Sequence, residues 1–420
     1  MQTLRWLLRP ISFLESCRRR FGDAFSVSFL GFETPMVMLS DPEAIRALYS
    51  VPGHTLPPGR TIALQPIVGS RSLLLLEGRE HLARRKLMLP PFHGERMRAY
   101  EAIVREAVTR EVEGWPEGQA FALHPRMQAV TLEVILRAVF GVTDPARRAR
   151  LAAGLSGLLA GTSSGLQFGV LLSRRFGGPD PLAALQKLRH EIDAMLGAEI
   201  AERRADPRED ILSLLLGARF EDGEPMADAE IRDQLMTLLL AGHETTATGL
   251  AWTFDLLVRH PPVLARLTAA IEAGEERYVR AVVAEALRLR PVVPLAGRRL
   301  SQELRVDGLV LPAGTDVTPA IWLTHTRADR YPEPYAFRPE RFLDDAPATY
   351  AWIPFGGGVR RCLGAAFAEM EMRVALAAIL ERRTLRPASG SAERVARRNV
   401  TFSPRGGTRV IATRAARLPH

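Results

Sequence analysis

Residues 355–364 (FGGGVRRCLG) combine three successive glycines, two arginines and a cysteine just before a stretch of helical character, residues 365–380. The positive end of a helix dipole stabilises a thiolate placed at its N-terminus. Glycine lets the backbone approach a large flat group closely and accepts positive φ. Arg360, two residues before Cys362, can reach an anionic part of whatever the thiolate binds. Together these properties suit an iron porphyrin held through a thiolate.

Other interpretations of Cys362 are a buried structural cysteine or a free nucleophile. A nucleophilic cysteine needs an activating histidine, and none is near this loop in the sequence. The glycines also resemble a dinucleotide fingerprint, but they do not follow a predicted strand of a βαβ unit. Haem ligation by Cys362 is therefore the favoured hypothesis.

Residues 228–260 predict one long helix, stopped by two prolines, that would run for roughly 50 Å. Its apolar face starts with large residues and continues, at the same spacing, with small and polar ones: Ile231, Leu235, Leu238, then Gly242, Thr245, Gly249 and Trp252. Glu244 beside Thr245 in mid-helix is costly unless partnered, although Glu244 could face solvent. A threonine hydroxyl there can bond the carbonyl four residues before it. Beside a haem, an acid and a hydroxyl can deliver protons to bound dioxygen.

Glu285 and Arg288 lie three residues apart within a helix that Pro291 terminates. Such a pair is ordinarily a surface salt bridge of small energy. The surrounding valines predict a well-packed helix, and a buried pair would need a further partner. Arg341 is available for that role.

His81 and Arg85 lie four residues apart, so a helix places them on one face. Together they could bind one carboxylate. The alternative is a solvated basic face, which is the commoner meaning of this pattern in isolation.

These four motifs together resemble the cytochrome P-450 superfamily of haem-thiolate proteins, over nearly the whole chain. The family's cysteine signature, Phe-x-x-Gly-x-Arg-x-Cys-x-Gly, is met at every fixed position of residues 355–364. Its oxygen-activation motif, (Ala/Gly)-Gly-x-(Asp/Glu)-Thr, is met by residues 241–245. Its Glu-x-x-Arg pair is met by Glu285 and Arg288, and the Pro-Glu-Arg-Phe stretch supplies Arg341.

The resemblance implies a role for each motif. Cys362 would be the axial ligand of haem b, and Glu244 with Thr245 would form the proton relay. Glu285, Arg288 and Arg341 would form a cluster that supports the fold and haem insertion. The implied contacts to the haem propionates are His81, Arg85, Arg298 and Arg360, with Arg299 as the alternative to Arg298.

The resemblance also implies a mainly α fold with small β-sheets (α+β), of the triangular haem type with a long central helix, as a single domain over residues 1–420. The sequence patterns predict a hairpin over 24–39, a helix capped by Asp41 and Pro42, a loop over 52–70, and helices over 77–89, 94–113, 125–140 and 180–204. They further predict a mobile apolar segment over 154–179, a mainly extended or looped stretch over 312–354, and a closing hairpin over 398–412.

Composition excludes several classes of protein. The net charge is +9, but 54 of the 56 basic residues are arginines scattered along the chain, which does not fit a nucleic-acid footprint. Two cysteines make a disulfide framework improbable and suit the cytoplasm. No apolar run approaches the roughly 18 residues of a membrane span, so no transmembrane anchor is expected. Residues 1–20 lack the features of a signal peptide, and a weak membrane-surface contact there stays open.

The chain is accordingly predicted to activate dioxygen and insert one oxygen atom into an unactivated C–H bond. It has no room for a fused reductase beside this fold, so a separate ferredoxin or flavodoxin with its reductase would supply electrons to a monomer. The residues expected to dock that acidic partner are Arg84, Arg85, Lys86 and Arg361.

The segments expected to line the substrate pocket are apolar: residues 62–68, 158–172, Leu239, 292–295 and 400–402. Within or beside them, the residues predicted to contact substrate are Val293, Leu295, Ala241 and Phe402. They indicate a lipophilic terpenoid, fatty acid or steroid. A peroxide-dependent hydroxylase and a non-catalytic haem sensor are the alternatives, and the acid–threonine pair argues against both.

Overall fold

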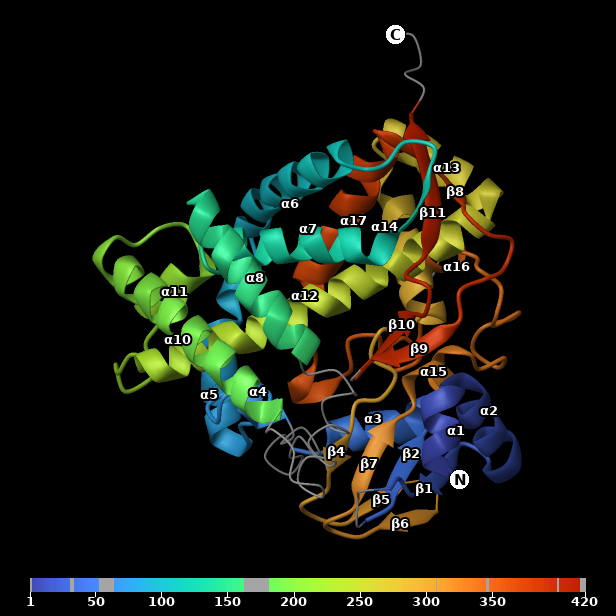
Figure 1. Cartoon of the computed structure of the whole chain (residues 1–420). Coiled ribbons are helices and arrows are strands. Elements are labelled where there is room, and N and C mark those ends of the chain that lie inside the picture. The colour runs from blue at the N-terminus through green and yellow to red at the C-terminus, as the bar shows by residue number, and fades with distance from the viewer. Residues whose placement is uncertain are drawn as a thin grey trace.

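A long central helix, α12 (Asp228–Arg259), organises the fold. The computed structural model of the chain describes residues 2–30, 34–52, 64–161, 181–306, 308–344, 347–398 and 400–415. Asp228 and Glu230 occupy the first turn of α12, where carboxylates favour the positive end of the helix dipole. The helix ends before Pro261 and Pro262, as the sequence predicts, and crosses the molecule (Figure 1).

The remaining helices surround α12 or cover the sheets. They are α1 (Gln2–Leu8), α2 (Pro10–Phe21), α3 (Pro42–Ser50), α4 (Gln65–Val68), α5 (Gly78–Met88), α6 (Arg96–Glu113), α7 (Leu123–Ala138), α8 (Pro145–Gly161), α10 (Pro181–Ala205), α11 (Ile211–Gly217), α13 (Pro261–Glu272), α14 (Glu276–Leu289), α15 (Ile321–His325), α16 (Arg341–Asp344) and α17 (Ala365–Leu380). Within the described residues there are also two short 3₁₀ turns, η3 (Pro90–Phe92) and η4 (Gly358–Arg360). The predicted helices over 77–89, 94–113, 125–140 and 180–204 are thus confirmed to within two residues at each end.

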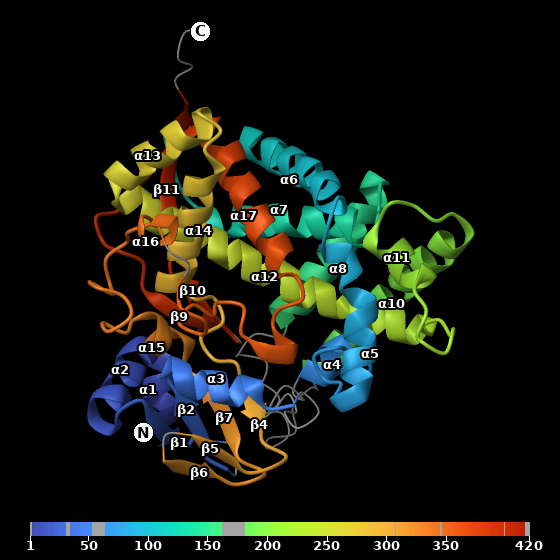
Figure 2. The same ribbon diagram turned by 180° about the vertical axis from the view of Figure 1, so that it is seen from behind.

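Helices α6, α7, α12, α14 and α17 pack together as the main helical body, seen from both sides in Figures 1 and 2. Apolar side chains at helical spacing explain this packing. On α14, for example, Val279, Val282, Val283 and Ala286 are all buried. The largest apolar core runs through these helices and fixes α12 between α7 and α17.

The strands form small separate sheets. The largest has the order β1 (Ala24–Val27), β2 (Met36–Leu39), β7 (Asp316–Pro319) and β4 (Arg298–Arg299), with β2 and β7 parallel. The others are β3 (Ala120–Ala122) with β11 (Arg409–Arg414) and β8 (Arg383–Pro387), the pair β9 (Val395–Arg398) and β10 (Thr401–Pro404), and the pair β5 (Leu304–Val306) and β6 (Leu309–Leu311). The prediction of a mainly α fold with small sheets is confirmed.

The predicted N-terminal hairpin and the helix after it are both present. Ala24 pairs with Leu39 and Val27 with Met36, while residues 31–33, which include the predicted turn at Gly31, lie outside the described residues. The side chain of Asp41 accepts hydrogen bonds from the backbone N–H groups of residues 43 and 44, at 2.9 and 3.0 Å. With Pro42 in the first helical position, this is the predicted cap of α3.

The predicted closing hairpin over 398–412 is wrong. Strand β10 pairs with β9, whereas β11 pairs with β8 and β3 in another sheet. The backbone of Phe402 is already engaged, because its N–H bonds to the carbonyl of Val292 and its carbonyl accepts the indole N–H of Trp252 at 2.7 Å. These contacts attach β10 to the helical body, so it cannot pair with β11.

Two predicted loops are partly helical. Residues 154–161 of the predicted mobile segment belong to α8, and residues 65–68 of the predicted loop form α4. Residues 162–180 and 53–63 lie outside the described part of the chain. The proline-rich stretch over 312–354 is mainly non-helical as predicted, with only the short α15 and α16 in its described residues. Among the described residues, no helix is both long and apolar enough to cross a membrane.

Candidate active site

The cysteine loop is a compact turn that leads directly into α17. The backbone N–H of Cys362 bonds to the carbonyl of Phe355 at 2.9 Å, which closes the loop. Gly356 and Gly358 have positive φ values of 68° and 62°, which favour glycine. A Cβ at Gly357 would lie 2.7 Å from the ring of Tyr49. The glycines therefore make room for this tyrosine, a reason that the sequence did not reveal.

The side chain of Cys362 is exposed, yet it is surrounded by protein. This burial raises the pKa of the thiol, and the N–H of Gly364 and the positive charges of Arg85 and Arg361 oppose the rise. Because Cys362 is accessible although protein surrounds it, we infer that it lines an internal space. The structure therefore places Cys362 where a bound group could reach it.

The middle of α12 borders an accessible space. Ala241 is exposed and Thr245 is partly exposed, while Leu239 and Ala247 are fully buried. The hydroxyl of Thr245 donates to the carbonyl of Ala241 at 2.5 Å, the bond to the preceding turn that the sequence suggested. The predicted change from a packed face to a small, polar one is thus visible in the structure.

Glu244 does not face bulk solvent as the alternative interpretation held. Its side chain is 24% exposed, and its carboxylate accepts a hydrogen bond of 2.5 Å from the Nε2 amide of Gln128 on α7. Burial raises the pKa of Glu244, opposed by this hydrogen bond, by the charge of Arg398 and by Thr248. Its hydrogen-bond partners are therefore on α7 and at Thr248, and the predicted acid–hydroxyl pair with Thr245 is not a direct contact.

Four predicted cofactor contacts converge beside the cysteine loop. Burial, together with the positive charges of Arg360, Arg85 and Arg298, lowers the pKa of His81 to about 3. Burial also lowers the pKa of Arg360 to about 10, together with the charges of Arg298 and Arg85 and against that of Glu77. Several cations held close together and partly buried are unfavourable without an anion. The carboxylates of a haem would supply that negative charge, so these residues fit the group.

The structure distinguishes Arg298 from its neighbour. Arg299 donates to Asp316 at 2.9 and 3.2 Å and is occupied there. The guanidinium of Arg298 lies 5.9 Å from the ring of Tyr49, and its charge acts on His81 and Arg360. The geometry therefore favours Arg298 over Arg299 as the residue that would contact a haem propionate.

The predicted Glu285–Arg288–Arg341 cluster is present and buried. Arg288 donates twice to Glu285, at 2.6 and 2.8 Å, and both side chains are fully buried. Arg341 donates to Glu285 at 3.3 Å, and the backbone N–H of Arg338 adds a bond at 2.9 Å. Arg288 also donates to three backbone carbonyls, those of His325, Pro334 and Ala336.

Two residues of the predicted docking surface are paired within this chain. Arg84 bonds to Glu230 at 2.7 Å, and Lys86 bonds to Glu221 at 2.8 Å. The positive charge of Arg85 interacts with Cys362 and His81 inside the site. Of the four residues proposed to meet an acidic partner, Arg361 has an exposed side chain beside the cysteine. Lys86 also stays 72% exposed in its pair with Glu221, so docking by these residues stays a prediction.

The predicted pocket residues divide into two groups. Ala241 is exposed, and Val293 and Leu295 are partly exposed. Phe402 is only 2% exposed and packs against Trp6, with ring centroids 5.7 Å apart. Its prediction as a pocket residue is therefore wrong, because its ring completes an aromatic cluster with the N-terminal helices. Leu239 is also fully buried.

Several polar residues near the site were missed from the sequence. Glu371 on α17 is 2% exposed, and burial raises its pKa to about 8 against a hydrogen bond with Thr246. An acid on a mainly apolar helix, nine residues after Cys362, was a readable signal. His325 accepts the N–H of Ile353 at 2.8 Å beside the Glu285 cluster, and no sequence pattern marked it.

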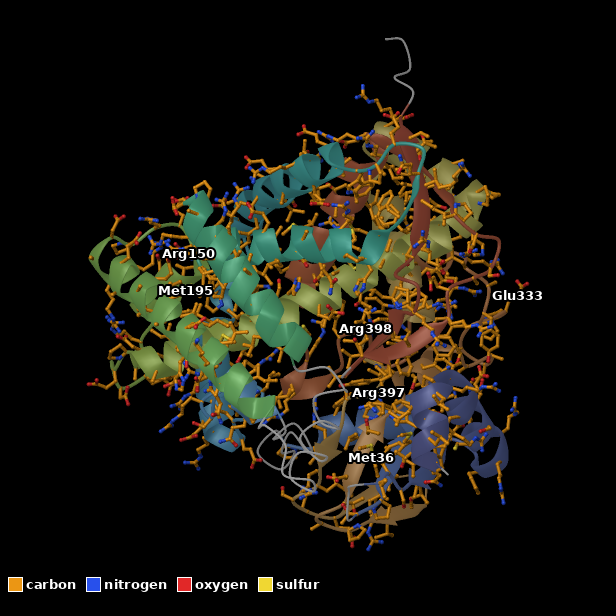
Figure 3. All side chains as sticks on the ribbon, viewed as in Figure 1. Met36, Arg150, Met195, Glu333, Arg397 and Arg398 are labelled. Atoms are coloured by element: carbon orange, nitrogen blue, oxygen red, sulfur yellow. The ribbon has the colours of Figure 1, made fainter. Side chains whose placement is uncertain are left out.

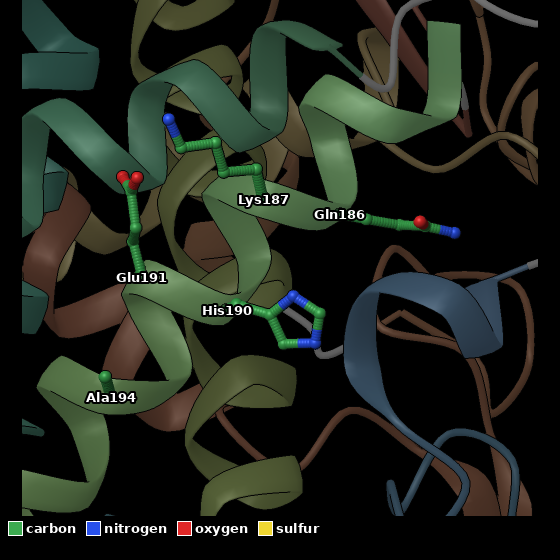
Figure 4. A pocket seen from close by; sticks show the side chains of 5 residues that line it. All are labelled: Gln186, Lys187, His190, Glu191 and Ala194. Carbon is green, nitrogen blue, oxygen red and sulfur yellow. The ribbon is translucent and has the colours of Figure 1, made fainter. Parts of the chain in front are cut away.

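A shallow depression of about 540 Å³ lies along α10 and is open to solvent (Figure 4). Its lining residues are Gln186, Lys187, His190, Glu191 and Ala194. None of them belongs to the cysteine loop or to the middle of α12. None belongs to the cation cluster either, by which we mean Arg85, Arg298 and Arg360 around His81. This depression is not the candidate site.

Comparison with known proteins identifies the family. Residues 4–407 match the family described as Cytochrome P450. A protein of Mycobacterium tuberculosis, provisionally named cytochrome P450 135B1, is 42% identical over 431 residues, which cover 99% of this chain and 90% of that protein. Another, provisionally named cytochrome P450 137, is 40% identical over 93% of this chain and 83% of its own length.

Solved structures agree with this result. "Retinoic acid bound cyanobacterial CYP120A1" has a TM-score of 0.84 and 25% identity, covering 99% of this chain and 96% of that one. The "cytochrome P450DA heme domain" has a TM-score of 0.85 over 97% of this chain and 93% of its own, and at 23% identity it supports the fold alone. The expected triangular haem fold is thereby confirmed. The chain belongs to the cytochrome P450 family of haem-thiolate monooxygenases.

Proposed function

We propose that this chain holds haem b through Cys362 and inserts one atom of dioxygen into a C–H bond of a lipophilic small molecule. One observation carries the proposal: Arg85 acts electrostatically both on the Cys362 thiol and on His81, the neutral residue around which Arg85, Arg298 and Arg360 gather. The thiol and the cations therefore belong to one site. A thiolate ligand at one point and cations for carboxylates at another are what a haem requires.

Each group of site residues would have a different role in this reaction. A bound haem supplies the iron that binds and reduces dioxygen. Arg85, Arg361 and the N–H of Gly364 favour the ionised form of Cys362. His81, Arg85, Arg298 and Arg360 would hold the carboxylates. Glu244 and Thr245 would hold and pass protons from the middle of α12.

A lipophilic substrate is supported by the apolar residues beside the site. Ala241, Val293 and Leu295 are accessible and offer no charge. The cyanobacterial relative of known structure is described as binding retinoic acid, a lipophilic compound. The substrate classes that we propose are terpenoids, fatty acids and steroids.

Electrons would come from a separate ferredoxin or flavodoxin with its reductase, docking near Arg361. We further propose that residues 1–420 act as a single domain and as a cytoplasmic monomer. Size-exclusion chromatography with light scattering tests the oligomeric state, and a dimer mass would contradict it.

The test of the function starts with the purified protein reduced under carbon monoxide. A strongly red-shifted Soret band is expected, with haem b in the extracted cofactor. Ferredoxin, its reductase and dioxygen should then support hydroxylation of a lipophilic compound that shifts the ferric spectrum. Turnover that is faster with hydrogen peroxide than with this electron supply would favour the peroxide-dependent alternative.

A further inference from the structure

The carboxylate of Glu244 is held by uncharged donors. Its Oε2 lies 2.5 Å from Nε2 of Gln128, and its Oε1 lies 3.5 Å from the hydroxyl of Thr248. Gln128 comes from α7, which lies beside α12 in Figures 1 and 2. The amide donor therefore reaches Glu244 across the contact between the two helices.

His124, one turn before Gln128 on α7, extends this arrangement. Its side chain is 1% exposed, and its Nε2 lies 3.1 Å from the hydroxyl of Thr248 and 3.5 Å from Oε1 of Glu244. Burial lowers the pKa of His124 to about 4, helped by the charges of Arg398 and His243, so the ring is neutral at pH 7. With its proton on Nε2, the ring donates to Thr248, whose hydroxyl can donate onward to Glu244.

Apart from His124, the charged and titratable groups near Glu244 among the described residues act on it only indirectly. Arg398, at the end of β9 (Figure 3), acts on Glu244 through its charge. His243 is turned to Thr131 of α7, at 2.9 Å, and Glu371 of α17 bonds to Thr246 instead. Among the described residues, no arginine or lysine forms an ion pair with Glu244. A carboxylate held in this way is oriented without being fixed in its ionised form, because a direct cation would favour that form strongly.

We propose that Gln128 is the positioning residue of Glu244: its amide holds the carboxylate against α7, where Glu244 exchanges protons with the His124–Thr248 side of the site. This inference rests on the proposed role of Glu244 in proton delivery. It adds that residue 128 must be a neutral donor of glutamine length. An apolar side chain would release the carboxylate, and a cation would keep it ionised.

The test measures the protonation of Glu244 itself in the holoenzyme, by infrared difference titration of protonated carboxyl groups. The band of Glu244 is the one that Glu244→Gln removes. Gln128→Met should raise its titration midpoint by about 1 to 2 pH units, because a hydrogen bond to the ionised form is lost. Gln128→Lys should lower it by at least about 1 unit. The pH at which turnover falls should move with the infrared midpoint in each variant.

Arg126→Met is the matched control. Arg126 lies two residues from Gln128 on α7 and pairs with Glu111 at 3.3 Å, with 41% of its side chain exposed. Its loss should leave the Glu244 midpoint unchanged, and the band of Glu371 should stay in place in every variant. All variants should keep the red-shifted carbon-monoxide spectrum. If Gln128→Met does not accumulate with haem, Gln128→Asn, whose amide is too short to reach, replaces it with the same expected direction.

Two failures can be told apart. If Glu244→Gln turns over as fast as the parent, the proposed relay role of Glu244 is wrong. If Glu244→Gln is slow but the midpoint in both Gln128 variants equals that of the parent, the relay stands and the positioning role of Gln128 is overturned.

Discussion

Glu285→Ala should remove a large part of the stability of this fold. Glu285 accepts four hydrogen bonds: two from Arg288, one from Arg341 and one from the backbone N–H of Arg338. Its loss leaves the fully buried Arg288 without a carboxylate. The partners that remain are the carbonyls of His325, Pro334 and Ala336 and the ring of Tyr331, whose centroid lies 4.8 Å from the guanidinium. Breaking a buried ion pair on one side costs roughly 3–5 kcal/mol. Since proteins are stable by only about 5–15 kcal/mol, most of the margin would be lost.

The same helix offers a matched control. Glu276 pairs with Arg280 at 2.8 Å and with Arg373 at 3.3 Å, but its own side chain is 68% exposed, so water can replace either contact. Glu276→Ala should therefore cost less than about 1 kcal/mol. The assay compares haem content per protein and the unfolding midpoint in urea for the parent and both variants. Because unfolding with a bound cofactor is not simply two-state, the midpoint of the cofactor-free protein should be measured as well.

We expect the parent and Glu276→Ala to have similar urea midpoints and haem content. Glu285→Ala should be far less stable and mostly free of haem. Equal urea midpoints and equal haem content for the two alanine variants would refute the reasoning. They would mean that the charge of Arg288 is stabilised sufficiently by its other partners, and that the carboxylate of Glu285 adds nothing to the stability of the fold.

Three further outcomes are expected. Cys362→Ser should fold but lose the red-shifted Soret band of the reduced, carbon-monoxide-bound protein, and an unchanged band would contradict ligation by Cys362. Thr245→Ala should bind haem and substrate like the parent but form less product per reductant oxidised, with hydrogen peroxide rising to match; full coupling would exclude its hydroxyl from proton delivery. Glu371 is buried in its neutral form, with its pKa raised from 4.5 to about 8, so the parent should lose stability as pH rises between these values. The free energy of unfolding of Glu371→Gln should therefore rise relative to that of the parent over this range by an amount on the order of a few kcal/mol. A difference independent of pH would show that Glu371 is ionised in the fold.

Helix positions could be predicted from the sequence because local signals determine them. The long α12 begins with carboxylates and ends at two prolines, and both signals act within one turn of the helix end. Asp41 caps α3 through the backbone N–H groups of the next residues, which is again local. Strand partners are not local. The predicted hairpin over 398–412 includes the strand at Thr401–Pro404, but the pairing of this strand depended on bonds to Val292 and Trp252, more than a hundred residues away.

In the site, too, local motifs could be predicted from the sequence, whereas contacts between distant residues could not. The motifs indicated which residues converge on the thiol, and the cation cluster forms around His81 as expected. The direction of a side chain was not predictable. Phe402 turns into an aromatic cluster with Trp6, and Glu244 turns toward Gln128, because neighbours distant in the sequence decide those orientations. Lys86 likewise pairs with Glu221, 135 residues away, a contact that no sequence pattern marked.

The glycines of the cysteine loop show how a local motif depends on a distant residue. Gly357 and Gly358 leave space for Tyr49, since a Cβ at either position would approach it within 3.0 Å. The ring of Tyr49 in turn lies 5.9 Å from the guanidinium of Arg298, close enough for a cation–π contact. Tyr49 thus joins the loop that carries Cys362 to one of the cations of the site. A larger residue at Gly357 would displace this ring and, through it, Arg298, so the glycines help to set the position of a cation as well as the course of the loop.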